Sequence, residues 1–150
     1  MVDLENKELL KIMWLPAERE VLFNIQNEIQ IPITSKFYDV FSDYIDIEKW
    51  RILYGEKYHN WLNEDDSSIY DINNEINLKM IDALVKINKR SSDAIFFYWF
   101  DIDRTFYERF KWEYCPLSNK RLLTLGDSYP AINSFISPDY PLLFPSSAYS

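Results

Sequence analysis

The chain has 150 residues, of which 47% are hydrophobic and 27% charged, and its formal net charge is −8. This length suffices for one domain with its own core, so we expect a single domain over residues 1–150 that needs no metal or disulfide. The composition excludes wholesale disorder, and the acidic balance argues against direct nucleic-acid binding. No apolar run approaches a membrane span and Cys115 is the single cysteine, so we expect a cytoplasmic protein.

Acidic residues are concentrated in the first half of the chain. Residues 1–75 carry 16 acidic and 7 basic side chains, a net of −9, whereas residues 76–150 carry 8 acidic and 9 basic ones, a net of +1. Tyrosine and tryptophan residues run through the same acidic stretch between Tyr38 and Tyr70. Acid interleaved with aromatic side chains is typical of a surface that meets a basic partner protein.

The first ninety residues predict about four to five successive helices. Asp3 suits the N-cap of a short first helix, and Pro16 suits the first turn of a second helix that extends to about Ile29. Thr34 or Ser35 can cap a third helix.

Two longer helices are expected after these. Asp46 is the expected N-cap of a helix from Ile47 to about Leu62, with Gly55 in its middle marking a close crossing. Ser68 can cap the longest helix, which ends near residues 88–90. Its apolar stripe has helical spacing and consists of Ile69, Ile72, Ile76, Met80, Ala83, Leu84 and Ile87.

Residues 91–126 predict strands instead. The continuous apolar run 94–100 suits a buried strand, the alternation in 110–114 suits a half-exposed strand, and 121–125 can supply a third. Residues 127–150 contain four prolines and predict an extended segment. The expected fold class is therefore α+β, with an N-terminal helical half, a small antiparallel sheet and an extended C-terminal segment.

One sequence motif suggests phosphoryl transfer. Residues 97–105 form an apolar strand followed by Asp-x-Asp-x-Thr, which resembles the first motif of the haloacid-dehalogenase superfamily. The resemblance implies a nucleophilic Asp101, an acid/base Asp103 and a bridging Mg²⁺. Arg104 stands where that family commonly has glycine, and the 45 residues after Thr105 are few for its large sheet. The alternative interpretation is a hairpin turn at 101–104.

Other catalytic sites have little support in the sequence. His59 is the only histidine, so Cys115 with His59 is the only possible thiol dyad, and a zinc site lacks ligands. Residues 64–66 lack the alternating ligands and the glycine of a calcium loop. We therefore expect no cofactor and no metal.

The resulting hypothesis is an acidic, non-enzymatic binding protein of inhibitor, immunity or anti-defence type, which captures a basic partner such as a nuclease. Two alternatives remain: a small metal-dependent hydrolase or phosphotransferase using Asp101 and Asp103, and a subunit of a larger assembly. Trp50, Tyr54 and Trp61 are expected in the core. The expected partner-binding residues face outward and are Tyr38, Asp39, Asp43, Asp46, Tyr58, Glu64, Asp65, Asp66 and Tyr70.

Overall fold

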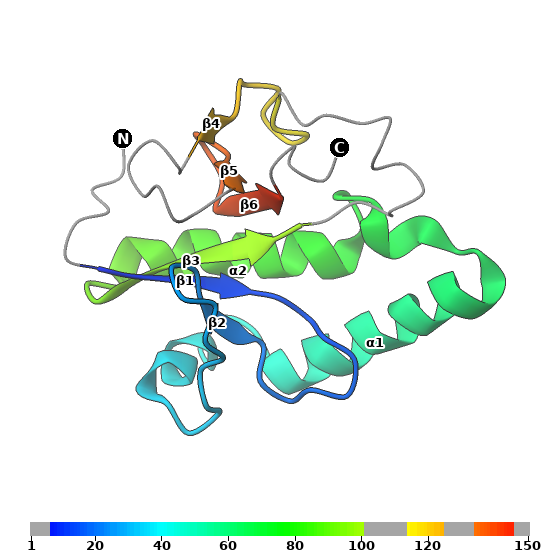
Figure 1. The fold of residues 1–150 in the computed structure, drawn as a ribbon, viewed down its shortest axis with the longest axis horizontal. Helices are drawn as coiled ribbons and strands as arrows, with labels where there is room; N and C mark the ends of the chain where they lie inside the picture. The colour runs from blue at the N-terminus through cyan, green and yellow to red at the C-terminus, as the bar shows by residue number, and fades with distance from the viewer. Residues whose placement is uncertain (1–6, 101–113, 125–133, 146–150) are drawn as a thin grey trace.

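A six-stranded mixed β-sheet organises the protein (Figure 1). The computed structural model describes residues 7–100, 114–124 and 134–145. The strands within these ranges are β1 (Glu8–Ile12), β2 (Leu22–Asn24), β3 (Ala94–Trp99), β4 (Leu123–Thr124), β5 (Ser134–Ile136) and β6 (Leu142–Pro145). The helices are the 3-10 helix η1 (Lys36–Phe41), α1 (Ile47–Glu64), the 3-10 helix η2 (Ser67–Tyr70) and α2 (Glu75–Arg90).

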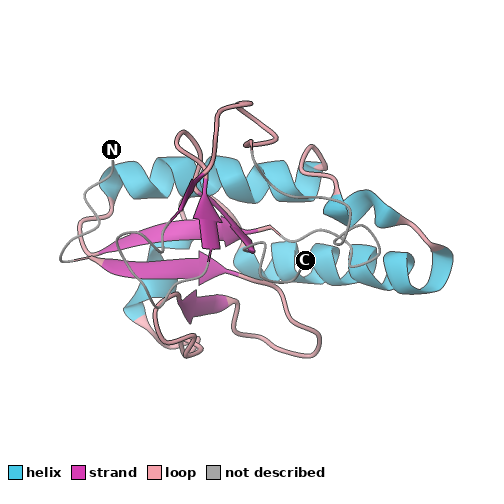
Figure 2. Cartoon of the chain, turned by 45° about the horizontal axis from the view of Figure 1, so that its top comes forward, coloured by secondary structure: helices cyan, strands magenta, loops and turns pink. Residues whose placement is uncertain are grey.

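The strands are ordered β2-β1-β3-β6-β5-β4. The three central strands β1, β3 and β6 are parallel, and the pairs at either side are antiparallel. Since β1 and β3 are parallel neighbours, the chain must cross between them, and α1 and α2 lie in that connection. Along α2 the axis follows roughly the direction of β1 and β3 (Figures 1 and 2).

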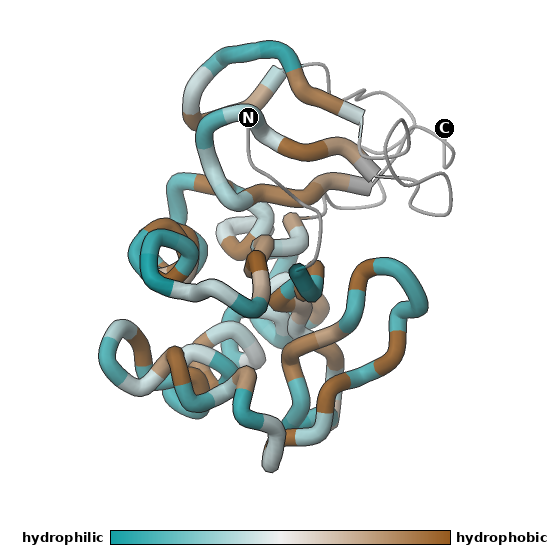
Figure 3. The backbone as a smooth tube through the Cα atoms, turned by 90° about the vertical axis from the view of Figure 1, so that its left-hand side faces the viewer, coloured by the Kyte–Doolittle hydropathy of each residue, from teal (hydrophilic) through white to brown (hydrophobic). Residues whose placement is uncertain are grey.

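Both faces of the central strands are buried. The larger core contains Leu10, Phe96 and Tyr98 together with apolar side chains of α2, whereas Leu9 and Phe97 belong to a second cluster. This alternation follows from the period of two in a strand, and burial on both faces is typical of parallel strands. Hydrophobic and hydrophilic residues interleave along the traced chain, as expected when strands and helices each bury one set of positions (Figure 3).

The expected helical N-terminal half is wrong. Residues 8–12 form β1 and residues 22–24 form β2, and the sheet is mixed rather than small and antiparallel. Two α-helices and two short 3-10 helices lie in the described part of the first ninety residues, not four to five helices in succession. The physical reason is that a short apolar run such as 9–12 fits a helix stripe and a buried strand equally well, and pairing with β3 decides between them.

The two long helices follow their local signals more closely. Asp46 caps α1, because its side chain accepts a hydrogen bond from the Lys49 N–H at 3.0 Å. The expected cap at Ser68 is wrong, because α2 begins after Asn74 and residues 67–70 form η2. From Met80 onward the expected stripe of α2 is buried.

Some expectations fall on residues that the structure does not describe. The turn at 101–104 and all but the last residue of the strand expected at 110–114 belong to these, and Tyr114 forms an isolated antiparallel bridge with Arg121. The expected strand at 121–125 corresponds to β4 at Leu123–Thr124. In contrast, β3 lies between two parallel neighbours and not in the expected antiparallel sheet.

Asn77 is a fully buried polar side chain that joins three elements. Its Nδ2 donates to the carbonyls of Ile69 and Asp71, at 2.9 and 2.8 Å, and its Oδ1 accepts from the hydroxyl of Tyr98. Burial also raises the pKa of Tyr98 well above its usual value, so this hydroxyl stays a donor. The amide therefore ties α2 to η2 and to β3.

Replacing Asn77 by leucine should lower the free energy of unfolding by about 2–4 kcal/mol, because two carbonyls and the Tyr98 hydroxyl lose their partner in a dry environment. Urea unfolding followed by circular dichroism measures this loss. The exposed neighbour Asn73 is the control, and Asn73→Leu should change the value by less than about 0.5 kcal/mol. Equal stability of both variants would contradict the assignment.

Candidate functional site

A pocket of about 500 Å³ lies where β1 and β3 end. We call it the aromatic pocket, because most of its large side chains are rings. In sheets with parallel strands the carboxyl ends are the usual place for a ligand, since the connections diverge there. Its lining residues come from the segment after β1, α1 from Tyr54 onward, η2 and the end of β3: Met13, Trp14, Leu15, Pro16, Tyr54, Tyr58, Trp61, Leu62, Tyr70, Tyr98 and Trp99.

Trp14 connects the segment after β1 to α1. Its ring stacks on Tyr54 with centroids 5.3 Å apart and lies 4.8 Å from the ring of Tyr58. The indole N–H donates to the carbonyl of Arg51 at 3.1 Å. Trp14 is therefore fixed by both its ring face and its polar atom.

Gly55 makes this close approach possible. A Cβ at this position would lie 3.2 Å from Cζ2 of Trp14, which is tighter than ordinary van der Waals contact. The close helix crossing expected at Gly55 is wrong in its partner, because the atoms nearest to this position belong to the Trp14 ring and not to another helix. Alanine here would gain roughly 1 kcal/mol of helix propensity, but the Trp14 ring would have to shift by a few tenths of an ångström.

The contacts between rings continue along α1 into η2. The ring centroids of Tyr58 and Trp61 lie 5.6 Å apart, and those of Trp61 and Tyr70 lie 5.2 Å apart at an interplanar angle of 75°. Edge-to-face and tilted pairs of this kind stabilise by about 0.5–1.5 kcal/mol beyond burial. The pocket wall is therefore a connected set of rings.

Acidic residues adjoin this wall at the end of α1. Glu64 and Asp65 are exposed, and they stand three and four residues after the lining residue Trp61, a spacing that makes residues neighbours on a helix surface. Asp65 ends the helix in the left-handed conformation, with φ of 56°. Asp66 accepts a hydrogen bond from the Ser68 N–H at 3.0 Å, and this bond lowers the pKa of its carboxyl.

A buried lysine contacts Trp99, one of the rings that line the pocket. The Lys11 ammonium lies 4.4 Å from the ring centroid of Trp99 and 3.6 Å from a carboxylate oxygen of Glu28. Burial lowers the pKa of Lys11, whereas Glu28 opposes that shift. The Lys11 ammonium thus interacts with both the ring face of Trp99 and the carboxylate of Glu28.

The residues expected to bind a partner fall into two groups. Asp39, Asp43 and Asp46 are exposed near the start of α1, whereas Tyr58, Tyr70 and residues 64–66 lie near its end. A helix of 18 residues is roughly 27 Å long. The acidic stretch therefore does not form one continuous patch, and the aromatic pocket adjoins only its second group.

Tyr38 has an internal role. Its hydroxyl accepts from the N–H groups of Val21 and Leu22, both at 3.2 Å, and donates to the carbonyl of Ile31 at 3.0 Å. Burial raises the pKa of Tyr38, and the two N–H donors oppose that rise. This hydroxyl therefore links η1 to β2 and is already engaged inside the protein.

Trp14, Trp99 and the segment 13–16 were not among the residues expected at a site. Trp61 was expected in the core, whereas its half-buried ring lines the pocket. One local signal was available: Gly55 stands between Tyr54 and Tyr58 on a helix rich in aromatics. A glycine at such a place indicates that a large side chain approaches, although not which one.

The described residues show no arrangement that supports the other candidate sites considered from the sequence. His59 is exposed on α1, whereas Cys115 is 1% exposed. Among the described residues, no group of three or more His, Cys, Asp or Glu side chains is placed to hold a metal ion. Asp101 and Asp103 lie outside the described residues.

No protein-family model, curated protein or solved structure matches this chain. Within the described ranges, none of the helices combines the length and apolar character needed to cross a membrane.

Replacing Tyr38 by phenylalanine should lower the free energy of unfolding by about 1–3 kcal/mol, because two N–H donors and one carbonyl lose the hydroxyl. The matched control is Tyr58→Phe, since within the described residues the Tyr58 side chain makes ring contacts and no hydrogen bond. Thermal and urea unfolding of both variants measure the difference. A Tyr38→Phe protein as stable as the control would show that the hydroxyl has no structural role.

Proposed function

We propose that the protein is a non-enzymatic binding module of inhibitor, immunity or anti-defence type, which acts in the cytoplasm and captures a basic partner protein. The aromatic pocket receives a lysine or arginine side chain of that partner. The single observation that carries this proposal is the connected set of rings next to the exposed acids Glu64 and Asp65. The subunit hypothesis is compatible with the same pocket.

Two physical effects favour binding of a positively charged side chain. A cation over a Trp or Tyr face gains about 0.5–1 kcal/mol when exposed and about 2 kcal/mol when desolvated. The net charge of −8 accelerates the encounter with a positively charged protein and holds its orientation as it approaches. Tyrosine and tryptophan lose little conformational entropy on binding, so they suit the centre of an interface.

The proposal is tested with the peptide acetyl-Arg-Arg-Arg-Arg-amide, titrated into ¹⁵N-labelled protein while the indole N–H resonances of Trp14, Trp61 and Trp99 are followed. Saturable shifts of these resonances are expected. The double variant Glu64→Gln, Asp65→Asn should weaken binding about 3- to 10-fold, because each exposed ion pair contributes up to about 1 kcal/mol. Asn is chosen at position 65 because it tolerates the left-handed backbone.

The matched control is the double variant Asp39→Asn, Asp43→Asn. It also removes two negative charges, but near the other end of α1, and should weaken binding less than about 2-fold. Trp61→Leu should weaken it several-fold through loss of the ring face. An equal effect of both charge pairs would indicate diffuse attraction to a negative protein and not a site. Shifts with acetyl-Glu-Glu-Glu-Glu-amide as large as those with the arginine peptide would also contradict the proposal.

One observation favours the phosphotransferase as a second candidate. In the described part of the sheet, β3 has parallel neighbours on both sides, and the Phe100 N–H donates to the Leu143 carbonyl at 2.9 Å. Asp101 therefore follows directly after a central parallel strand, which is the position that the resemblance implies for a catalytic aspartate.

This candidate is tested by calorimetric titration with Mg²⁺. A saturable site that disappears in Asp101→Asn, together with hydrolysis of para-nitrophenyl phosphate that requires the metal, would support the enzyme. Asp93→Asn is the control, since Asp93 is an exposed aspartate just before the same strand. If Mg²⁺ binding is absent, or if it is unchanged in Asp101→Asn, the second candidate fails.

A further inference from the structure

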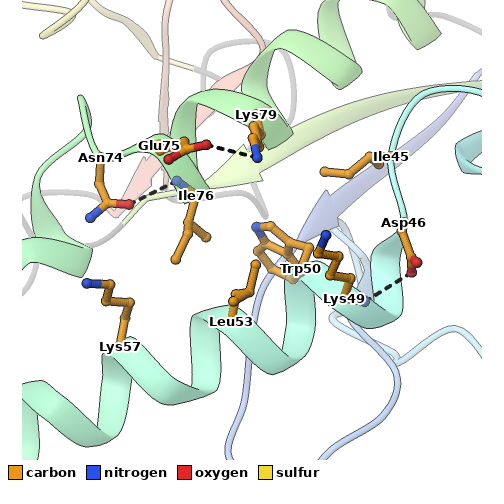
Figure 4. A pocket seen from close by; sticks show the side chains of 10 residues that line it. All are labelled: Ile45, Asp46, Lys49, Trp50, Leu53, Lys57, Asn74, Glu75, Ile76 and Lys79. Carbon is orange, nitrogen blue, oxygen red and sulfur yellow. Dashed lines mark hydrogen bonds and ion pairs between the residues drawn. The ribbon is translucent and has the colours of Figure 1, made fainter.

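A second cavity, of about 550 Å³, lies between α1 and the first turn of α2. It shares no lining residue with the aromatic pocket. Its apolar wall includes Trp50 and Leu53 from α1 and Ile76 from α2, and three lysines, Lys49, Lys57 and Lys79, surround it. Figure 4 shows the ammonium groups of Lys49 and Lys79 near Trp50, and that of Lys57 at the other end of the cavity, beyond Leu53.

The acids at this cavity are already engaged by other groups. Asp46 caps α1 through the Lys49 N–H. Glu75 pairs with the Lys79 ammonium at 2.9 Å, which lowers the pKa of Glu75. Within the described residues no carboxylate lies within 4 Å of the ammonium groups of Lys49 or Lys57. Lys57 is attracted at longer range by Asp66 and contributes to the lowered pKa of that carboxyl, whereas its ammonium forms no close ion pair.

The start of α2 adds to this positive potential. Asn74, Glu75 and Ile76 are the N-cap and first residues of a 16-residue helix and also line the cavity. The N-terminal end of a helix carries a partial positive charge. The residues that line the cavity include three lysines and two acids, a formal net of +1, in a chain whose net charge is −8.

We propose that this lysine cavity binds a small amphiphilic anion, an apolar chain that ends in a carboxylate or a phosphate. The chain packs on Trp50, Leu53 and Ile76, and the ammonium group of either Lys49 or Lys57, which flank these side chains at opposite ends, holds the head group. The volume lies within the range of about 300–1,000 Å³ that is usual for small-molecule sites. The inference is independent of the proposed protein-binding role, because the two pockets have separate walls.

The test uses octanoate, octyl phosphate, octanol, octylamine and inorganic phosphate, each titrated into ¹⁵N-labelled full-length protein. The Trp50 indole resonance reports on the lysine cavity. Saturable shifts are expected with octanoate or octyl phosphate, and the tighter of the two identifies the head group. Octanol and octylamine should bind at least 10-fold more weakly, and inorganic phosphate without a chain should not reach saturation in the same range.

The double variant Lys49→Gln, Lys57→Gln should weaken binding of the better anion at least 10-fold. Its matched control is Lys86→Gln, Lys89→Gln, which removes two exposed lysines in the last turns of α2 and should change binding less than 2-fold. Circular dichroism melts check that both variants stay folded. Octanol binding as tight as octanoate, an equal loss in both variants, or no saturable shift at Trp50 would overturn the proposal.

Discussion

The parallel pairing of β1 with β3 is the constraint on which the rest of the structure depends. Leu10 lies opposite Phe96, so the pairing joins residues separated by most of the chain. It buries both strand faces and sets where α1 and α2 must lie, because the crossover contains both helices. Where β6 does not reach along β3, the Asn88 amide pairs with the backbone N–H and carbonyl of Phe96, both at 2.9 Å. Closing so long a loop costs entropy, and burial of the apolar run in β3 offsets that cost.

Both candidate sites follow from this pairing. The parallel strands end together, and their ends place Trp14 and Trp99 in one pocket with rings of α1 and η2. On another side of α1, the crossover brings the start of α2 near Lys49 and Lys57. One helix therefore contributes to an aromatic pocket beside acids and to a cavity surrounded by lysines. The first half of the chain is negatively charged overall, but in the fold it contributes to two surfaces of different chemistry.

Local signals predicted the elements that local interactions determine. Asp46 at the start of α1 forms its capping bond within the next turn, and the α2 stripe from Met80 to Ile87 needs only helical spacing and one apolar neighbour. The candidate site was only partly predictable. Tyr58 and Tyr70 were assigned to a surface and do line a pocket, but Trp14 joins them through contacts across about forty residues. Tyr38 belongs to the same stretch of sequence as these tyrosines, and only the three hydrogen bonds of its hydroxyl in the folded protein show its internal role.

The sequence by itself determined the charge, the long helices with their caps or stripes, and the burial of residues 94–100. Those features depend on residue type and on neighbours within one or two turns of the chain. Tertiary structure alone decided that residues 8–12 are a strand, that the central strands are parallel, and that the acids divide between two ends of α1. A short apolar run has similar local free energy in a helix and in a strand, so a partner distant in sequence decides its conformation.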